Sequence, residues 1–181
     1  PPSAPADRAT PRPADPDFEA RVRASFARQG AMVTIGAQLD EVAPGRVVVG
    51  LVHSPAISQQ HGFVHAGMLA AAMDTACGYA ASTLMPAEAG VLTIEYKINL
   101  LAPARGPRLR CEAEVTKAGR TISVAEARAW GQDAQGRPTL AATMTATLMT
   151  ITGREGVKHS HQPRHRPRRP PFPIVPRRPP M

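Results

Sequence analysis

The sequence predicts an α+β protein in which an antiparallel sheet wraps around one long central helix. Residues 65–85 are apolar on nearly all sides, which is typical of a helix that is buried all round. After residue 90, apolar and polar residues alternate in runs separated by short turns, which is typical of antiparallel strands. One sheet covers only one side of such a helix, so we expect a second subunit to cover the rest.

The chain before the central helix supplies a short helix and two strands. We expect Asp17 to cap a helix over residues 18–29, which Gly30 ends. Two extended segments follow, joined by a tight Pro-Gly turn at residues 44–45. A loop over residues 54–64 then leads to the start of the long helix. The two extended segments cover residues 35–42 and 46–53.

The chain after the central helix is a series of strands. Pro86 closes the helix, and Ala118-Gly119 is expected to form a two-residue hairpin turn. Short connections favour an antiparallel meander. The predicted strands cover residues 92–100, 108–117, 120–132 and 139–150.

Composition indicates one domain over residues 17–153, with two Pro-rich segments expected to be disordered at residues 1–16 and 154–181. Residues 1–153 hold 14 Lys and Arg against 13 Asp and Glu, a net charge of +1. The last 28 residues have a net charge of +7, so the basicity belongs to the tail. A polyproline ligand or a nucleic-acid tail is the alternative to a solvated tail, and we expect no nucleic-acid partner.

Cysteine usage and hydropathy indicate a cytoplasmic protein. Cys77 and Cys111 lie within apolar patterns, which favours reduced core residues over a disulfide framework. A nucleophilic Cys77 is the alternative, but no nearby positive group would stabilise a thiolate. The N-terminal segment has no apolar signal region, and Asp74 interrupts the central apolar run. We therefore expect no membrane association.

Asp74 is the candidate catalytic residue. It lies in the middle of the predicted helix, among the small residues Ala70, Ala71, Cys77 and Gly78. An unpaired buried carboxylate is costly, so one placed there is a candidate for chemistry with a raised pKa. The structural alternatives are an N-cap, which the distance of position 74 from any helix end disfavours, and an Asp that is paired across the fold.

A metal site is not expected. His61 and His65 stand four residues apart, but no Glu or Cys accompanies them at ligand spacing, and Gly62 disfavours a helix there.

The segment around these residues resembles the hotdog-fold acyl-CoA thioesterases of the phenylacetate-degradation type. Their motif is a polar residue, a Gly-containing turn, His-Gly-Gly, and an Asp nine residues after the His. Gln59, Gly62, His65-Ala66-Gly67 and Asp74 match it, although Ala66 replaces the first Gly and some members have Asn where Gln59 stands. Residues 90–106 look like the family's strand and Pro loop, and residues 117–121 like its cofactor-lining hairpin.

The resemblance implies hydrolysis of a small aryl- or medium-chain acyl-CoA, at sites built between the two chains of a homodimer or a dimer-of-dimers tetramer. Asp74 would be the general base or nucleophile, and the helix start at Gly67 would polarise the carbonyl. Thr93 would orient the water and Gln59 would hold the carbonyl or the water. His65 is either catalytic or structural.

Coenzyme A would be bound as part of the substrate, without a separate cofactor. Its phosphates would meet basic residues of the Pro loop and the hairpin, and the alternative for each is a solvated surface charge. The expected coenzyme-binding residues are Arg105, Lys117, Gly119, Arg120 and Thr121, with Arg108 beside them.

Two other functions remain as alternatives. A non-catalytic acyl-CoA-binding module of the same fold would not need a buried carboxylate. A hydratase of this fold would need an Asp and a His paired on the helix side, and no His follows His65 within the helix.

Overall fold

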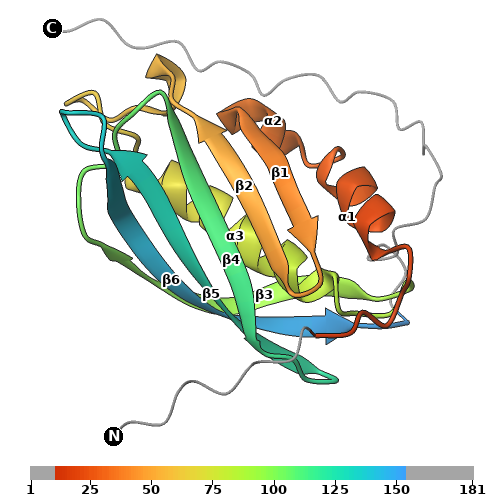
Figure 1. Cartoon of the computed structure of the whole chain (residues 1–181). Coiled ribbons are helices and arrows are strands. Elements are labelled where there is room, and N and C mark those ends of the chain that lie inside the picture. Colours follow the sequence, from red (N-terminus) through yellow and green to blue (C-terminus); the bar gives the residue numbers. More distant parts are fainter. Residues whose placement is uncertain (1–10, 154–181) are drawn as a thin grey trace, which may run out of the picture.

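A computed structural model describes residues 11–153, in which a curved antiparallel sheet wraps around one long helix (Figure 1). The predicted α+β fold is therefore confirmed. The tail from residue 154 and most of the N-terminal segment lie outside the described residues. The elements are α1 (Phe18–Phe26), α2 (Gly30–Ile35), β1 (Ala37–Ala43), β2 (Arg46–Val52), a 3₁₀ turn (Pro55–Ile57), α3 (Ala66–Ser82), β3 (Gly90–Leu100), β4 (Arg108–Lys117), β5 (Ile122–Gln132) and β6 (Pro138–Ile151).

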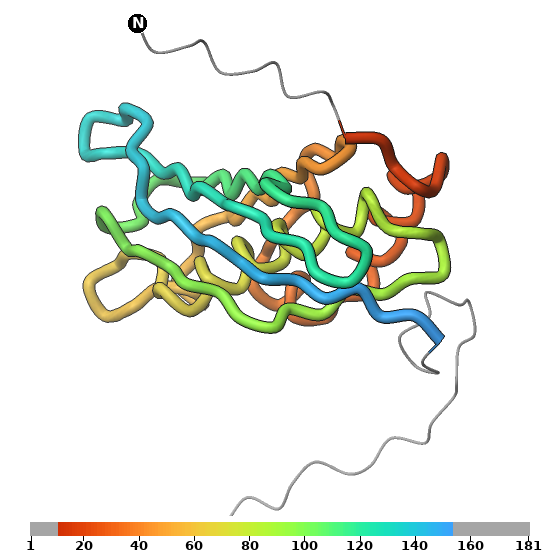
Figure 2. The backbone as a smooth tube through the Cα atoms, turned by 90° about the horizontal axis from the view of Figure 1, so that it is seen from below, coloured from red at the N-terminus to blue at the C-terminus, as the bar shows by residue number. Residues whose placement is uncertain are grey.

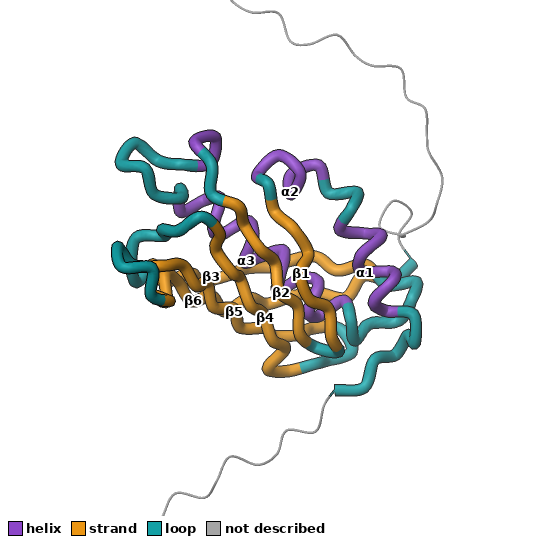
Figure 3. The backbone as a smooth tube through the Cα atoms, turned by 45° about the horizontal axis from the view of Figure 1, so that its top comes forward, coloured by secondary structure: helices purple, strands orange, loops and turns teal. Residues whose placement is uncertain are grey.

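The strand order differs from the predicted meander. The order is β1-β2-β4-β5-β6-β3, so β3 lies at the edge and pairs with β6 instead of β2 or β4. The reason is that α3 crosses the concave face of the sheet, in contact with β2, β4 and β5. After the helix, the chain runs to the far edge of the sheet, where β3 pairs with β6 (Figure 3). Local turn signals cannot reveal this crossover.

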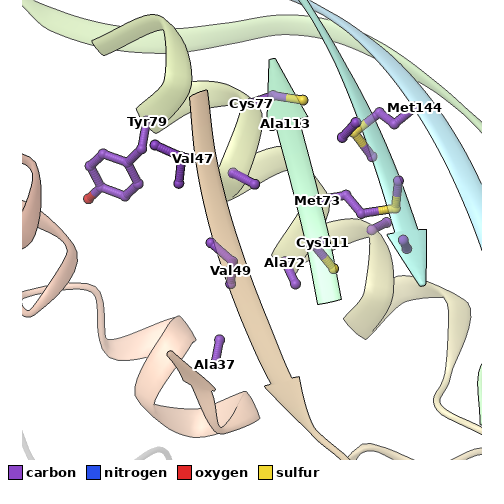
Figure 4. Close-up of a cluster of buried hydrophobic side chains, with 14 of the residues drawn as sticks. Ala37, Val47, Val49, Ala72, Met73, Cys77, Tyr79, Cys111, Ala113 and Met144 are labelled. Carbon is purple, nitrogen blue, oxygen red and sulfur yellow. The ribbon is translucent and has the colours of Figure 1, made fainter. Parts of the chain in front are cut away.

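Helix α3 is buried against the sheet because its inward side chains are small or flexible. Ala72, Met73, Ala76 and Cys77 are fully buried, and the short alanines let the helix backbone approach the strands. Figure 4 shows Ala72, Met73 and Cys77 against the inward residues of β2 and β4. The facing side chains are Val47, Val49, Cys111 and Ala113.

The N-terminal segment contains two helices where the sequence predicts one over residues 18–29. Helix α1 ends at Phe26, and Gln29 has an extended ψ of 96° that separates it from α2. Met32 and Ile35 of α2 are buried in the core, so tertiary packing sets the second helix. Gly30 therefore begins a helix instead of ending one.

Hydrogen bonds from Arg21 attach α1 to the end of α3. Arg21 donates to the carbonyl oxygens of Ser82 and Met85, both at 3.0 Å, and its Nε lies 2.7 Å from Asp15 Oδ2. The Asp17 side chain makes no capping hydrogen bond. Because Asp15 is only 8% exposed, the packed part of the chain begins before residue 17.

The outer edge of β3 is the main exposed apolar surface of the sheet. A bulge between Thr93 and Glu95 interrupts the predicted strict alternation. Four large apolar residues of this strand are 46–56% exposed, so the edge is both unpaired and apolar in the single chain. They are Leu92, Ile94, Tyr96 and Leu100.

No helix within residues 11–153 combines the length and the apolar character needed to cross a membrane.

Candidate functional site

Asp74 lies half-buried on α3, and its one hydrogen-bond partner within residues 11–153 is the hydroxyl of Thr93. Thr93 Oγ1 on β3 donates to Asp74 Oδ1 at 2.8 Å, so the structure brings these two predicted site residues together. Within residues 11–153, no Lys, Arg or His forms an ion pair with Asp74. Within the described residues, the partner of Asp74 across the fold is therefore a hydroxyl group and not a cation.

The environment of Asp74 favours its protonated form. Burial raises the pKa of the Asp74 carboxyl, and the hydrogen bond from Thr93 opposes part of this effect. A carboxylate with a raised pKa is a stronger base toward water once it is ionised.

A cavity of about 450 Å³ opens beside Asp74. It lies between α3, the first half of β3 and the N-terminal helical segment. Gly78, one turn after Asp74, leaves it open: a Cβ added there would have no atom within 4 Å. The lining residues are Ser25, Gln29, Asp74, Thr75, Gly78, Tyr79 and Gly90 to Thr93.

The start of α3 is capped by the side chain of His65. The backbone N–H of Gly67 donates to His65 Nδ1 at 3.0 Å. In this arrangement the Gly67 amide is occupied, which gives His65 a structural role as the helix N-cap. The Ala66 N–H has no hydrogen-bond partner within residues 11–153, and Ala66 is an exposed residue at the positive end of the helix.

Gln59 supports the loop that leads to α3. Its side-chain Oε1 accepts from the backbone N–H of His61, and the backbone N–H of Gln59 donates to the Phe63 carbonyl oxygen at 2.8 Å. Gln59, Phe63 and Ala66 line a second cavity of about 410 Å³ at the helix start, together with Leu100 and Leu101.

The two cavities share no lining residue. Along the helix axis, Asp74 lies about 10 Å from Gly67 at 1.5 Å per residue. Therefore one chain does not place the carboxylate beside the free helix amide.

The predicted coenzyme-binding residues are divided between the two ends of the molecule (Figure 2). The Arg105 guanidinium lies 4.4 Å from the centre of the Phe63 ring, near the start of α3. The hairpin with Gly119, Arg120 and Thr121 borders a cavity of about 610 Å³ beside the last turn of α3. Lys117 ends β4 at the same hairpin, and Arg108 is paired with Asp40 on β1.

Several residues near these cavities were not predicted. Tyr79 donates to Ser25 Oγ and accepts from Gln29 Nε2, both at 3.1 Å, and all three line the Asp74 cavity. His53 joins two loops near the helix start, with Gly106 O at 3.2 Å and Ser58 Oγ at 2.9 Å from its ring nitrogens. No pattern in the sequence indicated these contacts, since they cross between elements.

The cysteines and histidines form neither a nucleophile nor a metal centre in the described part of the chain. Burial raises the pKa of both the Cys77 and the Cys111 thiols to about 12, so both are protonated at neutral pH. Residues 11–153 contain no group of three or more His, Cys, Asp or Glu side chains placed to hold a metal ion.

Comparison with known proteins identifies the family. The model of the thioesterase superfamily matches residues 61–136, which include the helix start, Asp74 and Thr93. A thioesterase family protein of Silicibacter pomeroyi is 50% identical, with a TM-score of 0.73, covering 75% of this chain and 99% of its own. A Halobacterium salinarum protein named as an esterase is 29% identical over 61% of this chain and 76% of its own length.

A more distant structure has the same fold. The PaaI protein of the E. coli phenylacetic acid degradation operon is 19% identical, with a TM-score of 0.65 over 76% of this chain and 95% of its own. The sequence identity to the Silicibacter protein, the family match and the shared architecture agree. The chain therefore belongs to the thioesterase superfamily and is a thioester hydrolase with the hotdog fold.

Proposed function

We propose that the enzyme hydrolyses small aryl- or medium-chain acyl-CoA thioesters at a site formed by two copies of the chain. Asp74 of one copy acts as the base, and the helix start of the other binds the carbonyl. The main supporting observation is Asp74 itself: a half-buried carboxylate with a raised pKa, one hydrogen bond and an open cavity beside it.

The chemistry follows from the groups on the two half-sites. Asp74 takes a proton from a water molecule, and the resulting hydroxide attacks the thioester carbonyl carbon. The oxyanion is stabilised by the helix start, where the Ala66 N–H is the free donor and the Gly67 N–H becomes available if His65 rotates away. The C–S bond then breaks, and the coenzyme A thiolate leaves. Direct attack by Asp74 as a nucleophile is the second route.

The position of β3 explains how a second copy would complete the site. Gly90 to Thr93, at one end of the strand, line the Asp74 cavity, and Leu100, at the other end, lines the helix-start cavity. If two β3 edges pair antiparallel, opposite strand ends become neighbours. The Asp74 cavity of each copy then adjoins the helix start of the other, and the exposed apolar residues of β3 become buried.

The same pairing would assemble the coenzyme site. The hairpin adjoins the Gly90 end of β3 because Thr150 on β6 contacts both. Thr150 pairs with Val91 of β3, and its backbone N–H donates to the carbonyl oxygen of Thr121 in the hairpin at 2.8 Å. Arg105 lies beyond the Leu100 end. Antiparallel pairing therefore brings Arg105 of one chain toward the partner's hairpin, where both can meet the phosphates of coenzyme A. Coenzyme A enters as part of the substrate, in the cytoplasm, where the two buried cysteines stay reduced.

Complementation between two inactive variants tests the shared site. Free-thiol release is measured on a panel of acyl-CoA esters for the wild type, Asp74→Asn and Gln59→Ala, with Gln60→Ala as the matched loop control. After subunit exchange, a mixture of Asp74→Asn and Gln59→Ala should regain activity, because mixed dimers contain one intact site. An active monomer in sedimentation at assay concentration would refute the shared site, and acyl-CoA binding without thiol release would indicate a binding module.

A further inference from the structure

The Asp74 cavity has a polar wall that hydrolysis does not require. Tyr79 donates to Ser25 Oγ and accepts from Gln29 Nε2, at 3.1 Å each. Ser25 lies on α1, and Gln29 lies between α1 and α2. Both precede residues 61–136, the part of the chain that matches the family model. Two of the three residues of this wall are therefore supplied by a segment outside the matched region, and Tyr79 on α3 lies within it.

The wall is held in place and has unused hydrogen-bonding capacity. The Tyr79 side chain is 5% exposed, and its ring packs on Phe26 with centroids 5.9 Å apart. Its hydroxyl donates its proton to Ser25 and accepts from Gln29. Within residues 11–153, nothing donates to Gln29 Oε1, and nothing accepts from the Ser25 hydroxyl. One acceptor and one donor therefore remain available on residues that line the cavity.

The wall lies about one helical turn from the proposed base. Four to five residues separate Asp74 from Gly78 and Tyr79, which is about 6–7.5 Å along the helix. Gly78 has no side chain to obstruct this path, and a Cβ there would meet no atom within 4 Å. An acyl chain of a few carbons, with its thioester at Asp74, would reach Gln29 and Ser25.

We propose that Ser25, Gln29 and Tyr79 are specificity-determining residues that select acyl groups ending in a hydroxyl or a similar hydrogen-bonding group. This inference rests on the proposed acyl-CoA hydrolysis at Asp74. A terminal hydroxyl donates to Gln29 Oε1 and accepts from Ser25. A methyl group in its place displaces water and leaves Gln29 Oε1 and the Ser25 hydroxyl without a partner. Sites built to hydrogen-bond a substrate hydroxyl discriminate against substrates that lack it for this reason.

The test uses two substrates, ω-hydroxyhexanoyl-CoA and heptanoyl-CoA. Their acyl chains have the same number of non-hydrogen atoms, because the hydroxyl oxygen of the first takes the place of the terminal methyl carbon of the second. We expect the wild-type kcat/KM to favour the hydroxyl substrate by about three- to tenfold, the range that one neutral hydrogen bond supports. Gln29→Leu should bring this ratio to about one or below. Gln135→Leu, in the exposed turn between β5 and β6, is the matched control and should keep the wild-type ratio.

Two smaller substitutions distinguish a loss of substrate selection from a folding defect. Tyr79→Phe keeps the ring on Phe26 and Ser25→Ala removes one hydroxyl, and each should lower the ratio while the melting temperature stays near the wild-type value. A wild-type ratio in folded, active Gln29→Leu or Ser25→Ala overturns the proposed selection. If the wild type hydrolyses neither substrate, the result instead contradicts the proposed acyl-CoA hydrolysis on which this selection rests.

Discussion

Replacing Asp74 with Asn separates a catalytic role from a structural one, because the structure predicts opposite effects on activity and stability. The amide is nearly isosteric, and its oxygen can still accept from Thr93 Oγ1. Loss of a general base lowers kcat by about 10²- to 10⁴-fold. This corresponds to about 3–5 kcal/mol of transition-state stabilisation.

The effect on stability follows from the raised pKa of Asp74, which burial causes. The folded state holds the proton more tightly than the unfolded chain, so stability falls as the pH rises through the range between the two pKa values. At neutral pH the ionised carboxylate therefore costs stability. Asn has no charge, so Asp74→Asn should unfold at the same temperature as the wild type or a higher one.

The assay combines thiol release from acyl-CoA with thermal unfolding at neutral pH. Asp17→Asn is the matched control, since Asp17 is exposed and its side chain caps nothing. It should leave both rate and melting temperature unchanged. Wild-type turnover in folded Asp74→Asn would refute the catalytic assignment, and a clearly lower melting temperature would indicate a structural carboxylate.

Three further changes test other parts of the structure. Thr93→Val removes the hydrogen bond that lowers the pKa of Asp74, so the acidic limb of the kcat/KM profile should move to higher pH, whereas exposed Thr145→Val should not move it. Ile94→Asp, at a 52% exposed edge position, should produce an inactive monomer in sedimentation, and Val33→Asp, at a 73% exposed position on α2, should still associate. Arg21→Ala breaks the contacts to Asp15 and the end of α3 and should lower the free energy of unfolding, measured with denaturant, by at least about 2 kcal/mol. Arg23→Ala, at an exposed position on the same helix, should lower it far less. Equal losses would contradict the role of Arg21.

Sequence patterns were sufficient for the fold class because they report burial directly. The apolar run after His65 could only be a helix enclosed by other elements, and the structure has α3 at Ala66–Ser82. The alternating runs gave the last three strands to within two residues, because each has one face toward the helix and one toward solvent. Asp74 was identified in the same way, as a charge in a segment that has no exposed face.

The sequence was less informative wherever a contact joins distant segments. Gly30 is equally compatible with the end of one helix and the start of another, and the burial of Met32 and Ile35 decides in favour of a start. The edge position of β3 follows from the path of α3 across the sheet, which no turn signal encodes.

The sequence by itself determined a buried helix, the sheet around it and the carboxylate of Asp74 in that helix. Hydrophobic periodicity and a single charged residue in an apolar run are local properties of the chain. Only the tertiary structure showed that the Gly67 amide donates to His65, that Thr93 is hydrogen-bonded to Asp74, and that Ser25 on α1 and Gln29 just before α2 line the Asp74 cavity. Each of these depends on side chains that meet across elements. Their positions are set by the packing of the whole core, and residue spacing along the chain does not encode them.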